Sequence, residues 1–211
     1  MQFLFIQASP TLMNLPVNQA CLRNQQPILE VLSNVFTEKG NVLELACGTG
    51  QHAVHMASHL PYLTWQPTDT SDKLDGVNLW VNEANLDNLL PAKTLNVDEL
   101  PWKSFKSLNP KYGYCANLIH FVSEESTKNV FKGMALLLQE GGLFAVYGPI
   151  NNQGFTSEGN ASLDAWLKAD INPQAGIKEF ADTCQWAHDQ GLSLQENIQM
   201  PANNHIFIFK K

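Results

Sequence analysis

The strongest constraint on the fold is an alternation of short apolar segments with amphipathic ones, which runs through most of the chain and stops near its end. Strand-like segments are predicted at 42–46, 62–66, 93–95, 112–117 and 143–147. Such an alternation predicts parallel strands joined by right-handed crossovers, with helices on both faces of the sheet. The last two strand-like segments, 192–200 and 205–210, are separated by only four residues, too few for a crossover helix. This pair should therefore be antiparallel.

Two further expectations concern the helices and loops. A helix is predicted over 27–36, with Pro27 in its first turn. Residues 150–176 are rich in Asn, Gly and Ser, and they are predicted to form the longest irregular region. Irregular regions near strand ends often build substrate pockets, so we expect this region to contribute to one.

Length and composition indicate one globular domain, residues 1–211. A single core serves chains of up to about 250 residues, and a hydrophobic content of 44% is enough for a packed interior. The 13 basic residues are outnumbered by 20 acidic ones, so the chain lacks the basic stripe that binds nucleic-acid or membrane phosphates. We expect neither nucleic acid nor a membrane as a partner, and composition leaves the oligomeric state open.

Cysteine usage and hydropathy indicate a cytoplasmic protein. No segment approaches the roughly 20 apolar residues of a membrane span, and the N-terminus lacks the basic region of a signal peptide. The cysteines form no CxxC pair, so neither a zinc site nor a disulfide framework is indicated. They are Cys21, Cys47, Cys115 and Cys184.

The segment VLELACGTGQH, residues 42–52, joins the first strand to a helix through a turn with two glycines. In open α/β sheets this turn usually borders the ligand crevice beyond the carboxyl ends of the strands. Gly48 and Gly50 allow the backbone to approach a ligand, and the first amides of the helix attract an anion. Asp69 follows the second strand, roughly 20 positions later, where an acid can accept hydrogen bonds from ribose hydroxyls. Turn and acid together predict a nucleoside-containing cofactor.

Two classes of cofactor fit this turn. Gly48-x-Gly50-x-x-Ala53 matches the dinucleotide pattern G-x-G-x-x-G/A, which would make the protein an NAD(P)-dependent oxidoreductase or a flavin enzyme. The terminal strand pair without a crossover helix argues against the dinucleotide fold, which is built from two βαβαβ halves. Both classes remain open from these residues alone.

The run Glu44-Leu45-Ala46-Cys47-Gly48-Thr49-Gly50 resembles the first motif, E/D-x-G-x-G-x-G, of class I S-adenosylmethionine-dependent methyltransferases. Alanine stands at the first glycine position. The chain is similar more specifically to domain of unknown function family 938, from about Met13 onward. The similar segments are 23–24 with 27–29, 44–52, 67–69, 117–120, 147–149, 160 with 164–166, and 200–204.

This resemblance implies a Rossmann-like three-layer α/β sandwich. Its seven-stranded, mostly parallel sheet would end in an antiparallel C-terminal hairpin. Residues 1–12 fall outside the resemblance, so they are a possible extension and Met13 is a second candidate for the start of the natural chain.

The resemblance also implies S-adenosylmethionine as the cofactor, with S-adenosylhomocysteine as its product. Asp69 would hold the ribose and residues 96–98 would meet the adenine. Asn117 would touch the methionine end, unless it caps the next helix instead. The implied cofactor-binding residues are Glu44, Ala46, Cys47, Gly48, Thr49, Gly50, His52, Asp69, Asn96, Val97, Asp98, Asn117 and Leu118.

Three details of the turn and its helix qualify this assignment. Because Ala46 replaces a glycine, the backbone there is expected not to need a glycine-only conformation. Cys47 lies near a helix N-terminus, a setting that lowers a thiol pKa, although a free cysteine is more often simply a small buried residue. His52, His55 and His59 share one side of the helix, but metal ligands must converge and need supporting partners, so we expect no metal site.

Methyl transfer from a sulfonium is an in-line displacement, and holding the acceptor close supplies most of the catalysis. If the acceptor must lose a proton, His120 and Tyr147 are candidate general bases by position. Arg23 favours a carboxylate or another anion on the acceptor. The resemblance places the acceptor beside Arg23, Asn24, Tyr147, Asn160, Asp164 and Asn204.

We thus expect a methyltransferase that acts on an unidentified small molecule. Two alternatives are kept: an NAD(P)-dependent oxidoreductase, and a non-catalytic protein that binds S-adenosylmethionine.

Overall fold

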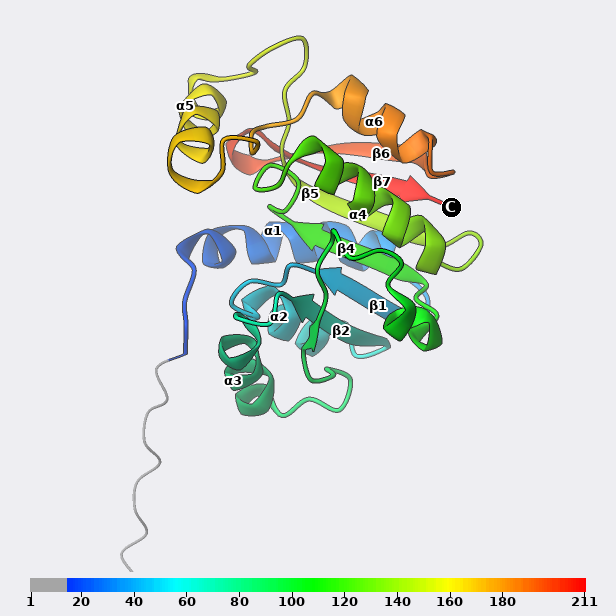
Figure 1. Ribbon diagram of the computed structural model, residues 1–211. Helices are drawn as coiled ribbons and strands as arrows, with labels where there is room; N and C mark the ends of the chain where they lie inside the picture. Colours follow the sequence, from blue (N-terminus) through cyan, green and yellow to red (C-terminus); the bar gives the residue numbers. More distant parts are fainter. Residues whose placement is uncertain (1–14) are drawn as a thin grey trace, which may run out of the picture.

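Seven strands form one sheet in the order β3-β2-β1-β4-β5-β7-β6. The computed structural model describes residues 15–211, and the sheet runs through the middle of this part of the chain (Figure 1). The strands are β1 (Gly40–Leu45), β2 (Leu63–Asp69), β3 (Lys93–Thr94), β4 (Tyr112–Ala116), β5 (Leu143–Pro149), β6 (Ser193–Met200) and β7 (Asn204–Lys210).

The sheet is parallel except at its C-terminal end. β1 pairs in parallel with both β2 and β4, and β4 pairs in parallel with β5. β7 lies antiparallel between β5 and β6. The predicted sheet, mostly parallel with an antiparallel C-terminal hairpin, is confirmed. A dinucleotide-binding sheet of order 3-2-1-4-5-6 has no antiparallel strand inserted in this way, so β7 argues against the oxidoreductase alternative.

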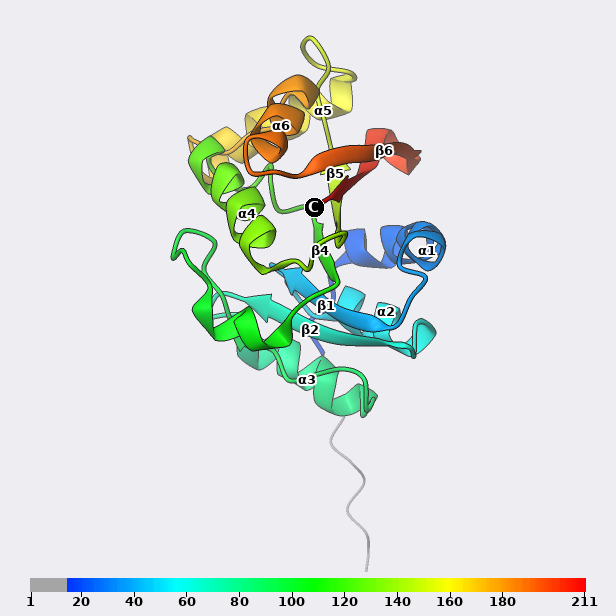
Figure 2. The ribbon, with the colours of Figure 1, turned by 90° about the vertical axis from the view of Figure 1, so that its right-hand side faces the viewer.

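Helices cover both faces of the sheet, as predicted for a three-layer sandwich. Buried residues of α1, α2 and α3 pack on one face, and buried residues of η1, α4 and α6 pack on the other. Figure 2 shows α4 and α6 on one side and α1 and α2 on the other. The helices are α1 (Gln19–Val35), α2 (Gln51–His59), α3 (Leu74–Ala84), η1 (Lys103–Leu108), α4 (Glu124–Leu137), α5 (Glu158–Trp166), η2 (Leu167–Ile171), α6 (Phe180–His188) and η3 (Pro201–Asn203).

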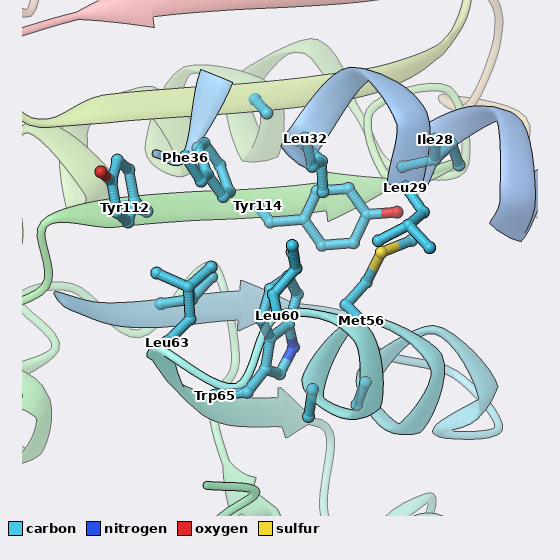
Figure 3. Packing of buried hydrophobic residues seen from close by; sticks show 14 of the residues in the cluster. Ile28, Leu29, Leu32, Phe36, Met56, Leu60, Leu63, Trp65, Tyr112 and Tyr114 are labelled. Carbon is cyan, nitrogen blue, oxygen red and sulfur yellow. The ribbon is translucent and has the colours of Figure 1, made fainter. Parts of the chain in front are cut away.

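Tyr114 of β4 lies at the centre of the face under α1 and α2. Figure 3 shows its ring between Leu32 of α1 and the side chains of Met56 and Leu60, in and just after α2. The side chain is fully buried, and the edge of Trp65 packs against it with 5.7 Å between ring centroids. A phenol at this depth needs a hydrogen-bond partner for its hydroxyl, and α2 supplies one.

Helix α1 begins earlier than predicted, because Gln19 rather than Pro27 starts it. Asn18 caps the helix, and its side-chain oxygen accepts a hydrogen bond from the Ala20 amide at 2.8 Å. Pro27 therefore lies inside the helix, where it has no N–H to donate to the carbonyl of Arg23. The polar run QACLRNQQ hides this first part of the helix from an apolar-spacing pattern.

The prediction of an irregular region at 150–176 was wrong in part, because this region contains α5 and η2. The hydroxyl of Ser157 caps α5 by accepting a hydrogen bond from the Asn160 amide at 3.0 Å. Gly159 and Asn160 are weak helix formers, so the first turn of α5 depends on this cap and on tertiary contacts.

Within residues 15–211, no helix is long and apolar enough to cross a membrane. The expectations about residues 1–12 and about Met13 as a chain start lie outside the described residues.

Two glycines in helices allow a matched test of the packing between η1 and α4. A β-carbon on Gly133 of α4 would overlap the ring of Trp102, whereas one on Gly159 of α5 would meet the Ser157 hydroxyl at an ordinary 3.6 Å. We expect Gly133→Ala to lower the free energy of unfolding by about 1–3 kcal/mol, because the Trp102 ring must move. Gly159→Ala should leave stability unchanged or raise it by up to about 1 kcal/mol through helix propensity. Urea unfolding of both variants gives the comparison, and equal effects would contradict it.

Candidate functional site

The carboxyl ends of β1, β2 and β4 meet at one edge of the sheet, on either side of the point where strand order reverses. β1 lies between β2 and β4, and its neighbours lead in opposite directions along the sheet. Ligands of open α/β sheets bind at such a switch point. The predicted turn follows β1, Asp69 ends β2, and Asn117 follows β4.

The turn after β1 has a left-handed backbone at both glycines, with φ of +62° at Gly48 and +88° at Gly50. Nothing lies within 4 Å of the place where a β-carbon of Gly48 would stand, so the turn is open to solvent or a ligand there. A β-carbon on Gly50 would press against Val77 of α3 at 3.1 Å. No side chain caps α2, so its first backbone amides stay available to an anion.

Asp69 is bound to the turn by its carboxylate. One oxygen accepts a hydrogen bond from the Gly48 amide at 2.7 Å, and the other accepts one from the Thr70 amide at 2.8 Å. The residue is 9% exposed, so its side chain is mostly buried but still reaches solvent beside the turn. The Thr70 hydroxyl also donates to the second oxygen at 3.3 Å, so the oxygen bound by the Gly48 amide is the one that can accept a further hydroxyl donor.

Glu44 lies behind the turn, where it is only 2% exposed. Its carboxylate accepts a hydrogen bond from the indole N–H of Trp65 at 2.6 Å. Burial, together with the negative charge of Asp69, raises the pKa of Glu44 to about 8, although the Trp65 hydrogen bond opposes this. The structure therefore makes Glu44 a buried support of the turn, titrating near neutral pH, and not a group on its open surface.

The structure corrects the expectation about Ala46 and decides between the two interpretations of Cys47. Ala46 has φ of +51°, the left-handed region that favours glycine, so the conformation is kept although the residue has changed. Cys47 is buried, and burial followed by the charges of Glu44 and Asp69 raises the pKa of its thiol instead of lowering it. Cys47 is thus a packing residue under the turn.

Thr49 and Gln51 join the turn to the start of α1. The hydroxyl of Thr49 donates to the side-chain oxygen of Gln51 at 2.8 Å, and the same oxygen accepts the backbone amide of Asn18 at 2.5 Å. Gln51 is buried and was not among the predicted site residues. Its position directly after the second glycine was the available signal.

His52 lies beneath Asn24 and away from the open side of the turn. Its Nε2 is 2.8 Å from Oδ1 of Asn24, and its Nδ1 is 3.2 Å from the hydroxyl of Tyr114. Burial, with a smaller contribution from His55, lowers the pKa of His52 to about 4, so the ring is neutral at pH 7. His52 is therefore the middle member of a hydrogen-bonded chain that runs from Tyr114 to Asn24.

The other two histidines of α2 do not converge with His52. The ring of His59 hydrogen-bonds the carbonyl of His55 at 2.8 Å, and the two rings are tilted by 44° with 4.5 Å between their centroids. Among residues 15–211, no group of three or more His, Cys, Asp or Glu side chains is arranged to hold a metal ion.

The loop after β3 is attached to α4 by Asp98. Its carboxylate accepts hydrogen bonds from the Ser126 hydroxyl at 3.1 Å and from the Asn129 amide at 3.2 Å. Asn96 accepts the Asp98 amide at 3.1 Å, and Val97 is half-buried against the apolar cluster on that face. The loop is therefore held at the same edge of the sheet as the turn, with the Asp98 side chain directed toward α4.

Asn117 has a left-handed backbone, with φ of +56°, and its amide donates to the carbonyl of Tyr147 at 2.8 Å. It does not cap the next helix, because Ser123 caps α4. Leu118 is buried beside it. His120 is also buried, at 2% exposure, and its Nδ1 has no hydrogen-bond partner within residues 15–211.

A cavity of about 260 Å³ opens beside Asn117, and we call it the Arg23 pocket. It brings together four of the six predicted acceptor residues: Arg23, Asn24, Tyr147 and Asn204. One face of α1 forms a wall, since positions 20, 23, 24 and 27 follow helical spacing. That spacing was the missed signal for Ala20 and Pro27. The lining residues are Ala20, Arg23, Asn24, Pro27, Asn117, Tyr147, Pro201, Ala202 and Asn204.

The other two predicted acceptor residues do not line this pocket. Asn160 is buried and donates to the carbonyl of Ile150 at 3.1 Å. Asp164 is buried, accepts the Ile177 amide at 2.8 Å and pairs with Lys168. Both brace the segment 150–178, and this segment does not contribute to the Arg23 pocket.

The two candidate bases differ in position. Tyr147 lines the Arg23 pocket, and burial raises the pKa of its phenol although the Asn24 amide and the Arg23 charge oppose this. His120 does not line the pocket. Burial, followed by the charge of Lys178, lowers the pKa of His120 to about 4.

Comparison with known proteins agrees with the fold described above. Residues 15–211 match the model of a family described as a protein of unknown function, DUF938. The fold is similar to that of an O-methyltransferase family protein from Burkholderia thailandensis, with a TM-score of 0.77 and 19% identity over 91% of this chain and 57% of that one. It is also similar to the S-adenosylmethionine-dependent methyltransferase SibL (TM-score 0.74, 17% identity, 91% and 55% covered). A third similar structure is the mitomycin 7-O-methyltransferase MmcR, with a TM-score of 0.76 and 9% identity over 91% of this chain and 54% of that one.

At these identities the likeness shows the fold, here the class I methyltransferase fold. The chain spans a little over half the length of these three structures.

The left-handed Ala46 can be tested by substitution. We expect Ala46→Gly to raise the free energy of unfolding by up to about 1 kcal/mol, because glycine relieves the strain at some entropic cost. Ala46→Val should lower it by about 1–3 kcal/mol, since a β-branched residue tolerates this backbone poorly. Chemical unfolding measures both, and a destabilised glycine variant would contradict the strain at this position.

The buried His120 should make the protein sensitive to acid. The unfolded chain binds a proton at this residue as the pH falls below about 6.5, whereas the folded protein does so only near pH 4. The stability present above pH 6.5 is therefore lost on acidification, by up to about 3 kcal/mol from this group. His120→Gln should flatten the fall in unfolding free energy between pH 7 and pH 4. His188→Gln, at an exposed position on α6, should keep the wild-type slope.

Proposed function

The chain belongs to DUF938, a family of proteins of unknown function. We propose that it is an S-adenosylmethionine-dependent methyltransferase that acts on a small molecule. The observation that carries the proposal is the bond between Asp69 and the Gly48 amide, at the switch point of the sheet. This bond unites a glycine turn with a rim carboxylate, the pair of groups suited to a nucleoside ligand.

The turn and the neighbouring loops provide groups that suit each part of the cofactor. The amides at the start of α2 suit its carboxylate, and Asp69 suits the ribose hydroxyls. Asn96 and Val97 follow β3 at the same edge, where they would border the adenine, and Asn117 would border the methionine end. When bound, the cofactor supplies a methyl group on a positively charged sulfur.

The chain itself then has to hold an acceptor and keep water away from it. The Arg23 pocket lies beside Asn117, which follows β4 next to the turn. A pocket of this size can fix a small molecule close to the cofactor, and proximity supplies most of the rate enhancement. Tyr147 lines the pocket and is the residue we propose to touch the acceptor. His120 is neutral and enclosed, so we assign it a supporting place behind Asn117.

Two features support this proposal over its alternatives. The antiparallel β7 is foreign to the dinucleotide fold of an oxidoreductase. A preformed pocket beside Asn117, into which Arg23, Asn24 and Tyr147 bring polar groups, favours an enzyme over a protein that only binds the cofactor. Calorimetric titration with S-adenosylmethionine tests the proposal first, and a folded sample that shows no binding would refute it. We also propose that residues 1–211 form a single domain.

Asp69 has a matched control in Asp72, which is exposed three residues later. We expect Asp69→Asn to weaken the binding of S-adenosylhomocysteine by about tenfold or more, because a hydrogen bond to a charged group contributes about 1.5–3 kcal/mol. Asp72→Asn should bind as the wild type does. Calorimetry gives both constants, and equal affinities for the two variants would remove Asp69 from the site.

A further inference from the structure

The charge of the Arg23 pocket has no counter-ion. Arg23 is the one charged side chain among the described residues that line the pocket. Within residues 15–211, no carboxylate lies within 4 Å of its guanidinium. The first fourteen residues contain neither aspartate nor glutamate, so they have no acidic side chain to offer. A guanidinium left in this way pairs best with a carboxylate or phosphate oxygen pair.

A buried chain of hydrogen bonds sets the orientation of the Asn24 amide. Nε2 of His52 faces Oδ1 of Asn24 at 2.8 Å, and because an amide oxygen only accepts, Nε2 carries the proton of the neutral imidazole and donates it there. Nδ1 of His52 is then an acceptor, and the Tyr114 hydroxyl donates to it at 3.2 Å. The amide nitrogen of Asn24 is left to face Tyr147 and the pocket.

Hydrogen-bond donors therefore line the α1 side of the Arg23 pocket. The Arg23 guanidinium and the Asn24 amide N–H groups have no acceptor role, and the Tyr147 hydroxyl beside them can donate its proton. On the opposite side, the amide nitrogen of Asn204 is occupied by the carbonyls of Pro201 and Ala202, at 3.1 and 3.2 Å. The pocket is therefore positive and donor-rich at α1, and a volume of about 260 Å³ suits a small ligand.

We propose that the Arg23 pocket binds the carboxylate of a small organic acid, the methyl acceptor, through Arg23, Asn24 and Tyr147. In this arrangement His52 is a positioning residue, because it acts through the amide of Asn24. The carboxylate anchors the molecule and is not assigned as the atom that is methylated. The assignment of this ligand as the acceptor rests on the proposed function.

The test uses benzoate and its neutral analogue benzamide as probes, titrated into the full chain and followed by protein NMR shifts. Benzoate should bind about tenfold more tightly than benzamide, because one hydrogen bond to a charged group is worth that ratio. Arg23→Gln should bring the two affinities within about twofold of each other. Asn24→Asp should make benzamide bind more tightly than benzoate, since the donor amide is replaced by a carboxylate that repels the carboxylate of benzoate. Lys132→Gln, an equal change of charge on α4 across the sheet, should keep it.

A second arm separates the acceptor from the carboxylate of the cofactor itself. Benzoate is titrated again with saturating S-adenosylhomocysteine, and retained binding supports the proposal. If S-adenosylhomocysteine displaces benzoate, Arg23 holds the amino-acid end of the cofactor and the acceptor assignment is overturned. Equal binding of benzoate and benzamide by the wild type also overturns it.

The benzoate preference needs no cofactor, so its failure is distinguishable from a failure of the proposed function. Thermal unfolding near the wild-type midpoint identifies the folded variants. Should Asn24→Asp fail to fold, the exposed Arg23→Gln decides the question alone.

Discussion

The hydrogen bond from the Gly48 amide to Asp69 is the interaction on which the arrangement of this site depends. It joins the ends of two neighbouring parallel strands, so the turn after β1 and the acid that ends β2 form one rim. The bond requires the left-handed backbone of the turn. The turn also requires a residue without a β-carbon at Gly50, because Val77 of α3 packs closely there. A backbone of this kind keeps its donors directed outward without help from a ligand, which reduces the ordering cost of binding.

Behind this rim, two buried polar groups are satisfied by neighbouring side chains, whereas Nδ1 of His120 is left without a partner within residues 15–211. Glu44 has the Trp65 indole, and Tyr114 has His52, which connects the apolar core under α1 to Asn24 at the surface. Such chains are costly when one member is unpaired, so they specify one arrangement of α1 on α2 and one orientation of Asn24. The pocket chemistry at the surface is thus set by groups that no ligand touches.

Much of the fold followed from the sequence, and less of the site did. The alternation of strands and helices and the short link at 201–204 are local patterns, and they predicted the parallel strands and the antiparallel hairpin correctly. The helix start at Gln19 was missed because its first turns carry polar residues. α5 was missed because its first turn has weak helix propensity. The Ser157 cap and the hydrogen bond of the buried Asn160 amide stabilise the helix instead. Asn160 and Asp164 were assigned to the pocket from resemblance, whereas their hydrogen bonds show them to be braces of their own segment.

By itself, then, the sequence determined the order of the strands, the direction of the last strand and the place of the glycine turn and its acid at the switch point. These depend on residue period, on connection length and on glycine, which act over a few residues. The tertiary structure decided that Ala46 adopts a left-handed backbone, that the Cys47 thiol has a raised pKa, and that Arg23, Asn117 and Asn204 surround one cavity. Burial and proximity between distant segments control these properties, and neither can be predicted from the spacing of residues along the chain.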